Sequence, residues 1–471
     1  MSNCESVASG LQALTLQWQR IFQCRAHIAQ PDAPRHQDVS SGPASRYCPR
    51  VIALLAMLAC SPPPAPAPAE DADSTVVSDP LPGPLSGLTI YVSAGHGYAA
   101  DALATGYQRS VAREDIIEDV WTGEFAADLL VPQLTALGAT VRTARERDRS
   151  PYAQQAGPAE LTDVSHHEWP MPLGTWDRDA PVARLFSGGT ASWFLTSPSD
   201  SMHPLYVRWI AASDADPLAM YDVTVGGTTT RFTVDQRTHG DEWMPLTNVP
   251  AGQLASVTLH GSGSGSLSAD QVRIGGGTFP LWSPRRREVV QRDLWDLAGK
   301  HYLQSQGAPA YVWEPEGSGM AFDATTRARW VEWSHQPIEP AIMLSLHTNA
   351  GGGTGTIVFV RNKCLAGPDC TPRAQDSTRI ADAVRERVVA VMSSRQQDWR
   401  DSGTIQNDFA EINEFINPGT PAVLVEFGFH DNRLDAVLLV DPDVKRELSE
   451  AVTDGVLAWW MSQPEPDFFE Q

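Results

Sequence analysis

The chain has 471 residues, of which 42% are hydrophobic and 20% charged, so it is long enough for two or three globular domains. Its formal net charge of −22 argues against a nucleic-acid partner, which would need a basic face. The acidic balance fits a secreted or envelope protein without establishing one.

Residues 1–60 have the layout of an export signal. Arg50 precedes a short apolar run, Val51 to Ala59, which ends in small residues before Cys60. The run is too short to span a bilayer. Its ending, "MLAC", resembles the lipobox of bacterial lipoproteins, whose cysteine is lipidated after cleavage. We therefore expect a mature chain that begins at Cys60 and is anchored to a membrane by lipid. A plain secretory signal and a buried helix are the alternatives.

The signal is followed by a Pro/Ala-rich stretch with acidic residues, over residues 61–84, which is typical of an extended linker. Two cysteines far downstream, Cys364 and Cys370, flank the short segment "LAGPD". In an oxidising compartment this loop can close as a disulfide. A zinc site at this pair is disfavoured because no second cysteine pair follows.

The first folded segment, residues 85–150, shows a β-α-β pattern. An apolar β-branched run within 85–101 predicts a strand that ends in a Gly-His-Gly loop. Apolar residues at helical spacing follow from Glu118 to Leu137, where Pro132 is expected to kink or break the helix near Val131. A second strand follows after Gly138, and the pattern as a whole predicts a parallel sheet with helices on its faces.

The rhythm changes over residues 163–278, where short strands alternate with glycine turns. The segment "VGGT" predicts one hairpin turn, and the block as a whole predicts a small all-β sandwich. Helices and apolar strands resume over residues 281–465. The predicted fold is therefore α/β, with a mostly parallel sheet flanked by helices and interrupted by an all-β insertion.

Three predicted strand ends carry polar residues, namely His96, His347 and Glu426, and in open α/β sheets sites gather where strands end. Glu118 lies on the helix face that should pack on the sheet, where a carboxylate is costly unless it is paired or bound to a cation. Two imidazoles and a carboxylate are a standard catalytic zinc set, and a further carboxylate can then move protons. Each residue also has a plainer interpretation: a hydrogen-bonded loop histidine, a helix N-terminal acid, or an ion pair between Glu426 and Arg327.

Four segments, "IYVSAGHGY", "EDVWTGEFAADLL…GATVRTARERD", "MLSLHTNA" and "PAVLVEFGFHDN", resemble the zinc-dependent N-acetylmuramoyl-L-alanine amidases of the Amidase_3 family. The resemblance spans residues 85–150 and 281–465. It implies hydrolysis of the amide between N-acetylmuramic acid and L-alanine in peptidoglycan. The implied site residues are zinc ligands His96, Glu118 and His347, with Glu426 as the catalytic acid/base.

The segments depart from the family pattern at several positions. Ser93-Ala94 stand where the family usually has Asp-Pro, and Tyr98 replaces the second loop glycine. Glu114 and Glu124 lie near Glu118 and are alternative helix ligands.

Asn349 follows His347 by two residues, and we expect it either to bind substrate or to support the loop. A role as a turn cap is the alternative for this residue.

The inserted block resembles the Golvesin/Xly-type β-sandwich domains, in segments such as "LYVRWIAA", "MYDVTVGG" and "ADQVRIGGG". The resemblance suggests carbohydrate or cell-wall binding. Five tryptophans are candidate stacking surfaces: Trp169, Trp176, Trp193, Trp209 and Trp243. For Trp209 and Trp243 in particular, a place in the sandwich core is the favoured alternative.

These inferences combine into an envelope-tethered zinc amidase whose partner is peptidoglycan, either periplasmic or anchored to the outer membrane as a lipoprotein. The alternatives are a zinc peptidase of related α/β fold and a catalytically inactive wall-binding lipoprotein. The sequence gives no indication of protein activators or of an oligomeric state.

Overall fold

The computed structural model describes residues 83–101, 105–157, 163–164, 167–171, 182–185, 189–198, 200–314, 321–337, 339–368 and 370–463. The predicted signal, residues 1–60, and nearly all of the predicted linker, residues 61–84, lie outside this part of the chain. The chain divides into two units, Met1–Glu70 and Asp71–Gln471, and every described residue belongs to the second. No helix among the described residues has the length and hydropathy needed to cross a membrane.

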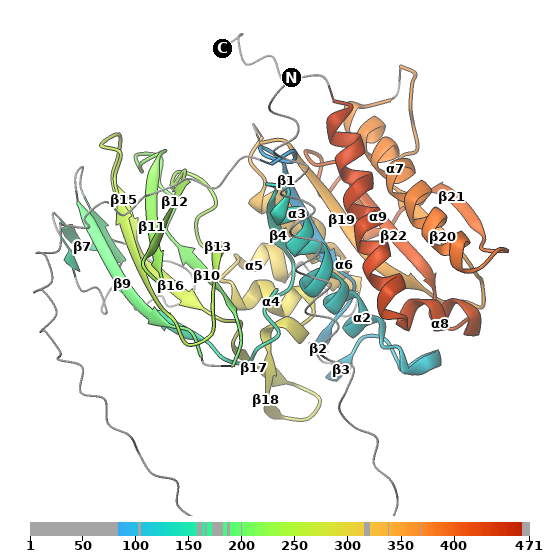
Figure 1. Cartoon of the computed structure of the whole chain (residues 1–471), viewed down its shortest axis with the longest axis horizontal. Helices are drawn as coiled ribbons and strands as arrows, with labels where there is room; N and C mark the ends of the chain where they lie inside the picture. Colours follow the sequence, from blue (N-terminus) through green and yellow to red (C-terminus); the bar gives the residue numbers. More distant parts are fainter. Residues whose placement is uncertain are drawn as a thin grey trace, which may run out of the picture. The chain divides into compact units, whose positions relative to one another are not determined.

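A six-stranded sheet forms the centre of the α/β core, in the order β21, β20, β22, β19, β1, β4 (Figure 1). Every neighbouring pair is parallel except β20 and β22, which are antiparallel. The predicted α/β fold with a mostly parallel sheet is therefore confirmed. The strands are β1 (Thr89–Ala94), β4 (Thr140–Thr143), β19 (Ala341–Asn349), β20 (Thr356–Val360), β21 (Asp401–Gln406) and β22 (Ala422–Phe429).

Helices cover both faces of this sheet, and alternate side chains of β1 and β19 enter two different cores. Ile90 and Leu344 pack with helices α2, α3, α7, α8 and α9, whereas Tyr91 and Met343 pack with α4, α5 and α6. Because both faces are buried, these strands read as nearly continuous apolar runs. The helices are α2 (Glu118–Glu124), α3 (Val131–Ala136), α4 (Gly299–Ser305), α5 (Ala310–Trp313), α6 (Ala321–Ser334), α7 (Pro372–Arg395), α8 (Arg433–Val440) and α9 (Pro442–Met461).

The helix expected to kink or break near Val131 is not broken there, because the chain stays helical from Glu118 to Ala136. A π-helical segment, η2 (Phe125–Leu130), joins α2 to α3. Pro132 is the second residue of α3 and follows directly on this π-helical segment. The wider turn changes the hydrogen-bond register ahead of the proline, so no break is needed.

The insertion is all-β, as predicted, and contains two larger antiparallel sheets, β13-β10-β16-β5 and β12-β11-β14-β9-β6, and a small one, β15-β8-β7. The predicted hairpin at "VGGT" is confirmed: Gly226 and Gly227 have φ of 57° and 82°, as a tight hairpin turn requires. The strands are β5 (Gln154–Ala156), β6 (Asp163–Val164), β7 (His167–Met171), β8 (Val182–Leu185), β9 (Thr190–Thr196), β10 (His203–Arg208), β11 (Ala219–Val225), β12 (Thr228–Val234), β13 (Met244–Val249), β14 (Leu254–His260), β15 (Leu267–Ala269) and β16 (Gln271–Ile274).

The tryptophans of the insertion do not form a stacking surface where they are described. Trp193 and Trp209 are 1% exposed and lie in the sandwich core, and Trp243 is 8% exposed. Trp193 and Trp209 fill the space between the sheets, and the guanidinium of Arg273 lies 4.9 Å from the ring of Trp243. The stacking hypothesis is therefore wrong for these three buried rings. Trp176 and the side chain of Trp169 lie outside the described residues.

The insertion leaves the core and returns to it at one place, where the Gly277 N–H donates to the Ser150 carbonyl at 3.1 Å. Buried ion pairs also join the two parts. Arg142 of β4 pairs with Glu242, and Arg273 of β16 pairs with Glu146 at 2.6 Å.

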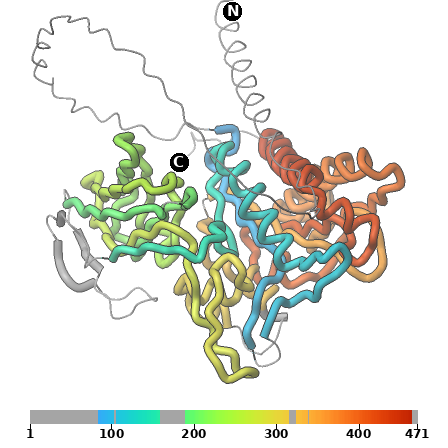
Figure 2. The backbone as a smooth tube through the Cα atoms, turned by 60° about the horizontal axis from the view of Figure 1, so that its bottom comes forward, coloured from blue at the N-terminus to red at the C-terminus, as the bar shows by residue number. Residues whose placement is uncertain are grey.

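Two short hairpins complete the core. The first is β2 (Tyr98–Ala100) with β3 (Thr105–Tyr107), and the second is β17 (Thr278–Ser283) with β18 (Glu288–Asp293). Figure 2 shows the second hairpin, in yellow, projecting beside the first, in blue. Three short turns, η1 (Arg113–Asp115), η4 (Leu294–Asp296) and η5 (Ala410–Ile412), connect the larger elements. The predicted disulfide between Cys364 and Cys370 is present, with Cα atoms 5.7 Å apart.

Candidate metal centre

His96 lies directly beyond the carboxyl end of β1, in a loop with a left-handed backbone, φ 62°. The Gly95 N–H donates to the Leu346 carbonyl and so keeps this loop against β19. A Cβ on Gly95 would lie 2.7 Å from the ring of His347, so only glycine allows the two histidines to approach. The loop brings the two imidazole rings to a centroid distance of 4.9 Å.

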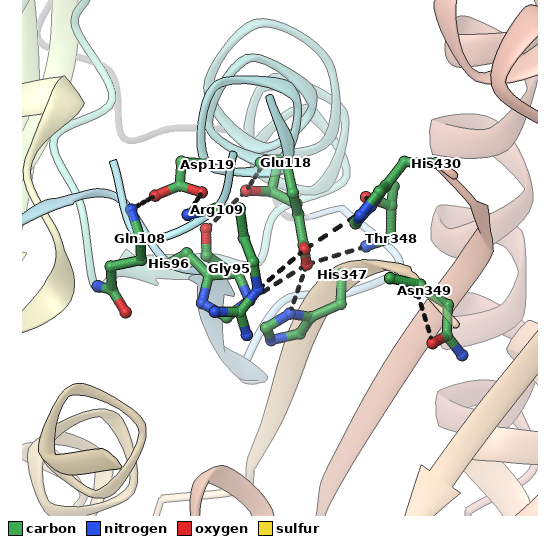
Figure 3. Close-up of polar contacts among 12 residues, drawn as sticks. Gly95, His96, Gln108, Arg109, Glu118, Asp119, His347, Thr348, Asn349 and His430 are labelled. Atoms are coloured by element: carbon green, nitrogen blue, oxygen red, sulfur yellow. Dashed lines mark hydrogen bonds and ion pairs between the residues drawn. The ribbon is translucent and has the colours of Figure 1, made fainter. Parts of the chain in front are cut away.

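Glu118 is the first residue of α2, and its carboxylate lies between the two imidazoles (Figure 3). Its Oε1 is 3.3 Å from Nε2 of His96 and 2.9 Å from Nδ1 of His347. The Thr348 N–H also donates to Oε1, and the Arg109 guanidinium lies 3.6 Å from Oε2. The helix is tied to the histidine loop because the Thr122 hydroxyl donates to the Gly95 carbonyl at 2.9 Å.

The other two acids considered for the helix ligand lie elsewhere. Glu114 is exposed in the short turn η1. Glu124 pairs with Arg149 at 2.9 Å and with Lys445 at 3.0 Å. Among these three carboxylates, only Glu118 faces the imidazoles in the described contacts.

One ligand atom from each of His96, Glu118 and His347 lies within 4.8 Å of the others, and all three residues are buried. Burial lowers the pKa of His96. Burial alone would raise the pKa of Glu118, but hydrogen bonds from His347 and His96 outweigh it and hold that pKa well below its usual range. Two imidazoles around an ionised carboxylate fit the donor set of a catalytic zinc site, which leaves one position for water.

Glu426 of β22 is the direct neighbour of His347 across the parallel β19–β22 pair. Its Oε2 is buried and has no hydrogen-bond partner among the described residues. Burial raises the pKa of Glu426 to about 8; His347 opposes this rise, and the carboxylates of Glu118 and Glu411 add to it. The alternative ion pair with Arg327 is not formed, because Arg327 binds Asp323 and Glu411 instead.

Two further carboxylates of this region were not singled out from the sequence. Asp119 accepts the N–H groups of Gly97, Gln108 and Arg109 at 2.7 to 3.1 Å, and so supports the loop that carries His96. The Asp119 carboxylate thus holds the backbone of this loop in a chain that has Ser93-Ala94 where the family usually has Asp-Pro. Its position beside Glu118 was the available signal.

Glu411, in η5, lies 3.3 Å from Nε2 of His347. No periodic pattern or strand end marks this position in the sequence.

Asn349 ends β19, and its Oδ1 accepts the N–H of Ala350 at 2.8 Å. Its backbone carbonyl accepts the N–H of His430. Figure 3 shows the Asn349 side chain apart from the contact between Glu118 and His347. The turn role is therefore present, while a substrate contact stays a prediction.

A His/Glu/His donor set lies at the carboxyl ends of parallel strands, beside a carboxylate of which one oxygen has no hydrogen-bond partner in the described part of the chain. This arrangement defines the class of protein: a hydrolase domain suited to a divalent metal ion. Residues 297–458 match the family model described as N-acetylmuramoyl-L-alanine amidase, Amidase_3, and residues 182–276 match the Golvesin C-terminal domain. The chain therefore contains an amidase domain of this family and a Golvesin C-terminal domain, as the sequence segments predicted. His96 and Glu118 lie outside the matched range, and the fold brings them to His347.

Solved structures of several amidases are similar to this chain. The N-acetylmuramoyl-L-alanine amidase from Clostridium difficile 630 is 23% identical over 30% of this chain and 67% of that one, with a TM-score of 0.23. The catalytic domain of CwlV from Bacillus (Paenibacillus) polymyxa is 19% identical over 30% and 66%, with a TM-score of 0.23. Ami1 from Mycobacterium smegmatis is 12% identical over 80% and 99%, with a TM-score of 0.34.

The chain thus spans about two thirds of the length of the first two structures. No curated protein matches it.

Proposed function

We propose that this chain hydrolyses the amide between the lactyl group of N-acetylmuramic acid and the L-alanine of the stem peptide in peptidoglycan. The observation that carries the proposal is the buried set of His96, Glu118 and His347 beside Oε2 of Glu426, which has no hydrogen-bond partner in the part of the chain that the structure describes. These three residues would hold zinc. When bound, zinc lowers the pKa of a water ligand to about 7 and polarises a carbonyl oxygen.

Glu426 is the residue that moves the proton in this proposal. Its carboxylate oxygen has no competing partner among the described residues, and β22 keeps it next to His347. A carboxyl with its pKa raised to about 8 exchanges a proton readily near neutral pH. Glu426 would accept a proton from the attacking water and return it to the leaving amine nitrogen of L-alanine.

The test is incubation of the purified mature protein with peptidoglycan. We expect release of free lactyl groups on the glycan and of stem peptides that begin with L-alanine. Glu426→Gln should keep its zinc and lose about 10²-fold or more in turnover, whereas His347→Ala should lose both zinc and activity. Glu414→Gln makes the same glutamate-to-glutamine change outside the proposed site. It is the matched control and should keep both zinc and activity.

Other outcomes of that experiment would overturn the proposal. Hydrolysis of free peptides alone would make the protein a zinc peptidase. Zinc binding without hydrolysis of either substrate would make it an inactive wall-binding protein. Normal zinc content and activity in His347→Ala would exclude this histidine as a ligand.

A peptidoglycan amidase acts at the cell envelope, and we propose that lipid on Cys60 anchors this one there, in the periplasm or at the outer membrane. The support is the "MLAC" ending of the apolar run that follows Arg50. Mass spectrometry of the membrane-fraction protein should find a lipidated N-terminal cysteine. An unlipidated N-terminus would exclude the anchor.

A further inference from the structure

Both ring nitrogens of His347 face carboxylates. Nδ1 lies 2.9 Å from Oε1 of Glu118, the oxygen that also approaches His96, and Nε2 lies 3.3 Å from Oε2 of Glu411. A neutral imidazole carries one proton, and the nitrogen that binds a metal must be the one without it. Since Nδ1 faces the shared donor cluster, Nε2 is the nitrogen that would carry the proton once a metal is bound.

Glu411 is itself held rigidly. It is 4% exposed, and Oε1 accepts from Nη1 of Arg327 at 2.5 Å. The hydroxyl of Ser345, two residues before His347 on β19, donates to Oε2. Both carboxylate oxygens therefore have a buried donor besides His347, which restricts the rotation of the carboxylate.

The support extends one step further from the metal centre. The guanidinium of Arg327, on α6, also binds Asp323 at 2.5 Å. Asp323 in turn accepts the N–H of Lys300 at 2.8 Å and the side-chain amide of Gln108 at 3.1 Å. The carboxylate of Glu411 is thus fixed to helices on the sheet face opposite α2.

We infer that Glu411 is a positioning residue: it accepts a hydrogen bond from Nε2–H of His347 and thereby fixes the tautomer that presents Nδ1 to the metal. The inference rests on the proposed zinc site. A metal-bound histidine whose second nitrogen is held by a carboxylate keeps its ring orientation, and loss of that carboxylate weakens the metal site.

The direct test is the tautomer of His347 in the zinc-bound protein with ¹⁵N-labelled histidine, measured by long-range ¹H–¹⁵N correlation. His347→Gln serves to assign the signals. We expect the proton on Nε2 of His347. A proton on Nδ1 would overturn the inference, and this measurement needs no variant of Glu411.

The second test is zinc affinity, measured by competition with a chelator. Glu411→Ala should bind zinc about 10- to 100-fold more weakly than the wild type, and Glu411→Gln should recover part of the loss because its amide oxygen still accepts. Glu414→Gln should bind zinc normally. Unchanged affinity in Glu411→Ala would overturn the inference. A protein with the expected tautomer that leaves peptidoglycan intact would contradict only the proposed function.

A second inference comes from a different part of the core, the β17–β18 hairpin. Leu281 and Val290 face the core, whereas the cross-strand neighbours Trp282 and Val289 are 57% and 61% exposed. Exposed apolar side chains that lie together on one face usually mark an interaction site. Here an indole ring provides the flat surface on which a sugar ring can stack.

The tip of this hairpin is basic, although the whole chain has a charge of −22. Residues 285–287 are three consecutive exposed arginines, and Arg286 lies 3.8 Å from Glu288. The hairpin packs along β2 and β3, and its base, at Arg292, lies beside the residues that follow His96. Ser283 hydrogen-bonds Thr105 of β3 at 2.6 Å, and Arg292 stacks over Tyr98, two residues after His96, at 3.9 Å.

We propose that this face and tip bind the glycan strand and stem carboxylates of peptidoglycan next to the metal centre, a proposal that rests on the proposed function. A sugar polymer that bears carboxylates matches an exposed indole beside arginines in both shape and charge. An anionic membrane surface has the charge but offers no sugar ring.

The test uses Glu426→Gln, which binds without turnover, in co-sedimentation with insoluble peptidoglycan. Adding Trp282→Ala should weaken binding about tenfold. Replacing arginines 285–287 by glutamine should weaken it and reduce its salt dependence. Tyr311→Ala, which removes another exposed aromatic, is the control and should bind normally.

Equal binding of the Trp282→Ala protein and its parent would overturn the hairpin proposal. The variants can also be tested for binding to vesicles of anionic phospholipid. Weaker binding to the vesicles with unchanged binding to peptidoglycan would overturn the proposal too, because the hairpin would then recognise a membrane surface. Because sedimentation needs no hydrolysis, failure of the proposed activity would leave this result readable.

Discussion

Zinc binding to this protein should release a proton from His347. In the metal-free protein burial lowers the pKa of His347, but Glu411 and Glu118 outweigh burial and raise that pKa to about 10. A histidine binds metal only through a deprotonated nitrogen, so the ring must lose one proton. His96 contributes little because burial lowers its pKa.

The size of the effect follows from the distance between the pKa and the working pH. A pH of about 6 is about four units below the pKa of His347. Removing the proton at that pH costs about 5 kcal/mol, and this cost opposes metal binding. In Glu426→Gln, where His347 is the group that releases a proton, the apparent zinc affinity should therefore rise about tenfold for each unit of pH up to the pKa of His347. Glu426, with a pKa of about 8, can release a second proton, and Glu426→Gln removes that contribution.

Calorimetric titration of zinc into metal-free Glu426→Gln, in buffers of different ionisation enthalpy, measures the protons released. About pH 6 is suitable because a zinc-bound water, with a pKa of about 7, is still largely protonated there. We expect about one proton per zinc in Glu426→Gln and up to two in the wild type. Release of no proton by Glu426→Gln would refute the reasoning.

Three further predictions concern packing and charge. Gly95→Ala should lose zinc affinity while the protein still folds, because the added Cβ would meet the ring of His347 at 2.7 Å; normal zinc affinity by chelator competition would contradict this. Burial raises the pKa of Asp270 to about 6, above its unfolded value, so this carboxyl stabilises the fold below about pH 4 and loses about 3 kcal/mol as pH rises to about 6. Denaturant unfolding of Asp270→Asn against pH should lack that loss, and an unchanged profile would exclude it. Glu242→Ala should destabilise the protein by about 3–5 kcal/mol because it leaves Arg142 buried without its partner, and unfolding curves that match the wild type would show that the pair adds nothing.

The sequence predicted well those features that depend on local pattern. Apolar runs and helical spacing marked the strands and helices of the α/β core, and polar residues at strand ends marked His347 and Glu426. The Gly-Gly hairpin and the disulfide were also predicted from local spacing. These features need only neighbours in the chain, so one sequence is enough to find them.

The features that were missed depend on contacts between distant segments. Glu411 lies in a short turn with no periodic pattern, and its contact with His347 exists only because η5 folds against β19. Trp193 was a candidate stacking surface, but its face of strand β9 is the buried one.

The closed base of the insertion has a kinetic consequence. Strand β4 and helix α4 belong to one core but lie more than a hundred residues apart in the chain. The hydrogen bond between Gly277 and Ser150 brings the two ends of the insertion together. If the sandwich folds first, the amidase core closes a short connection instead of a long one, so the entropic barrier to its assembly is lower. The insertion can then act as a folding scaffold for the domain it interrupts.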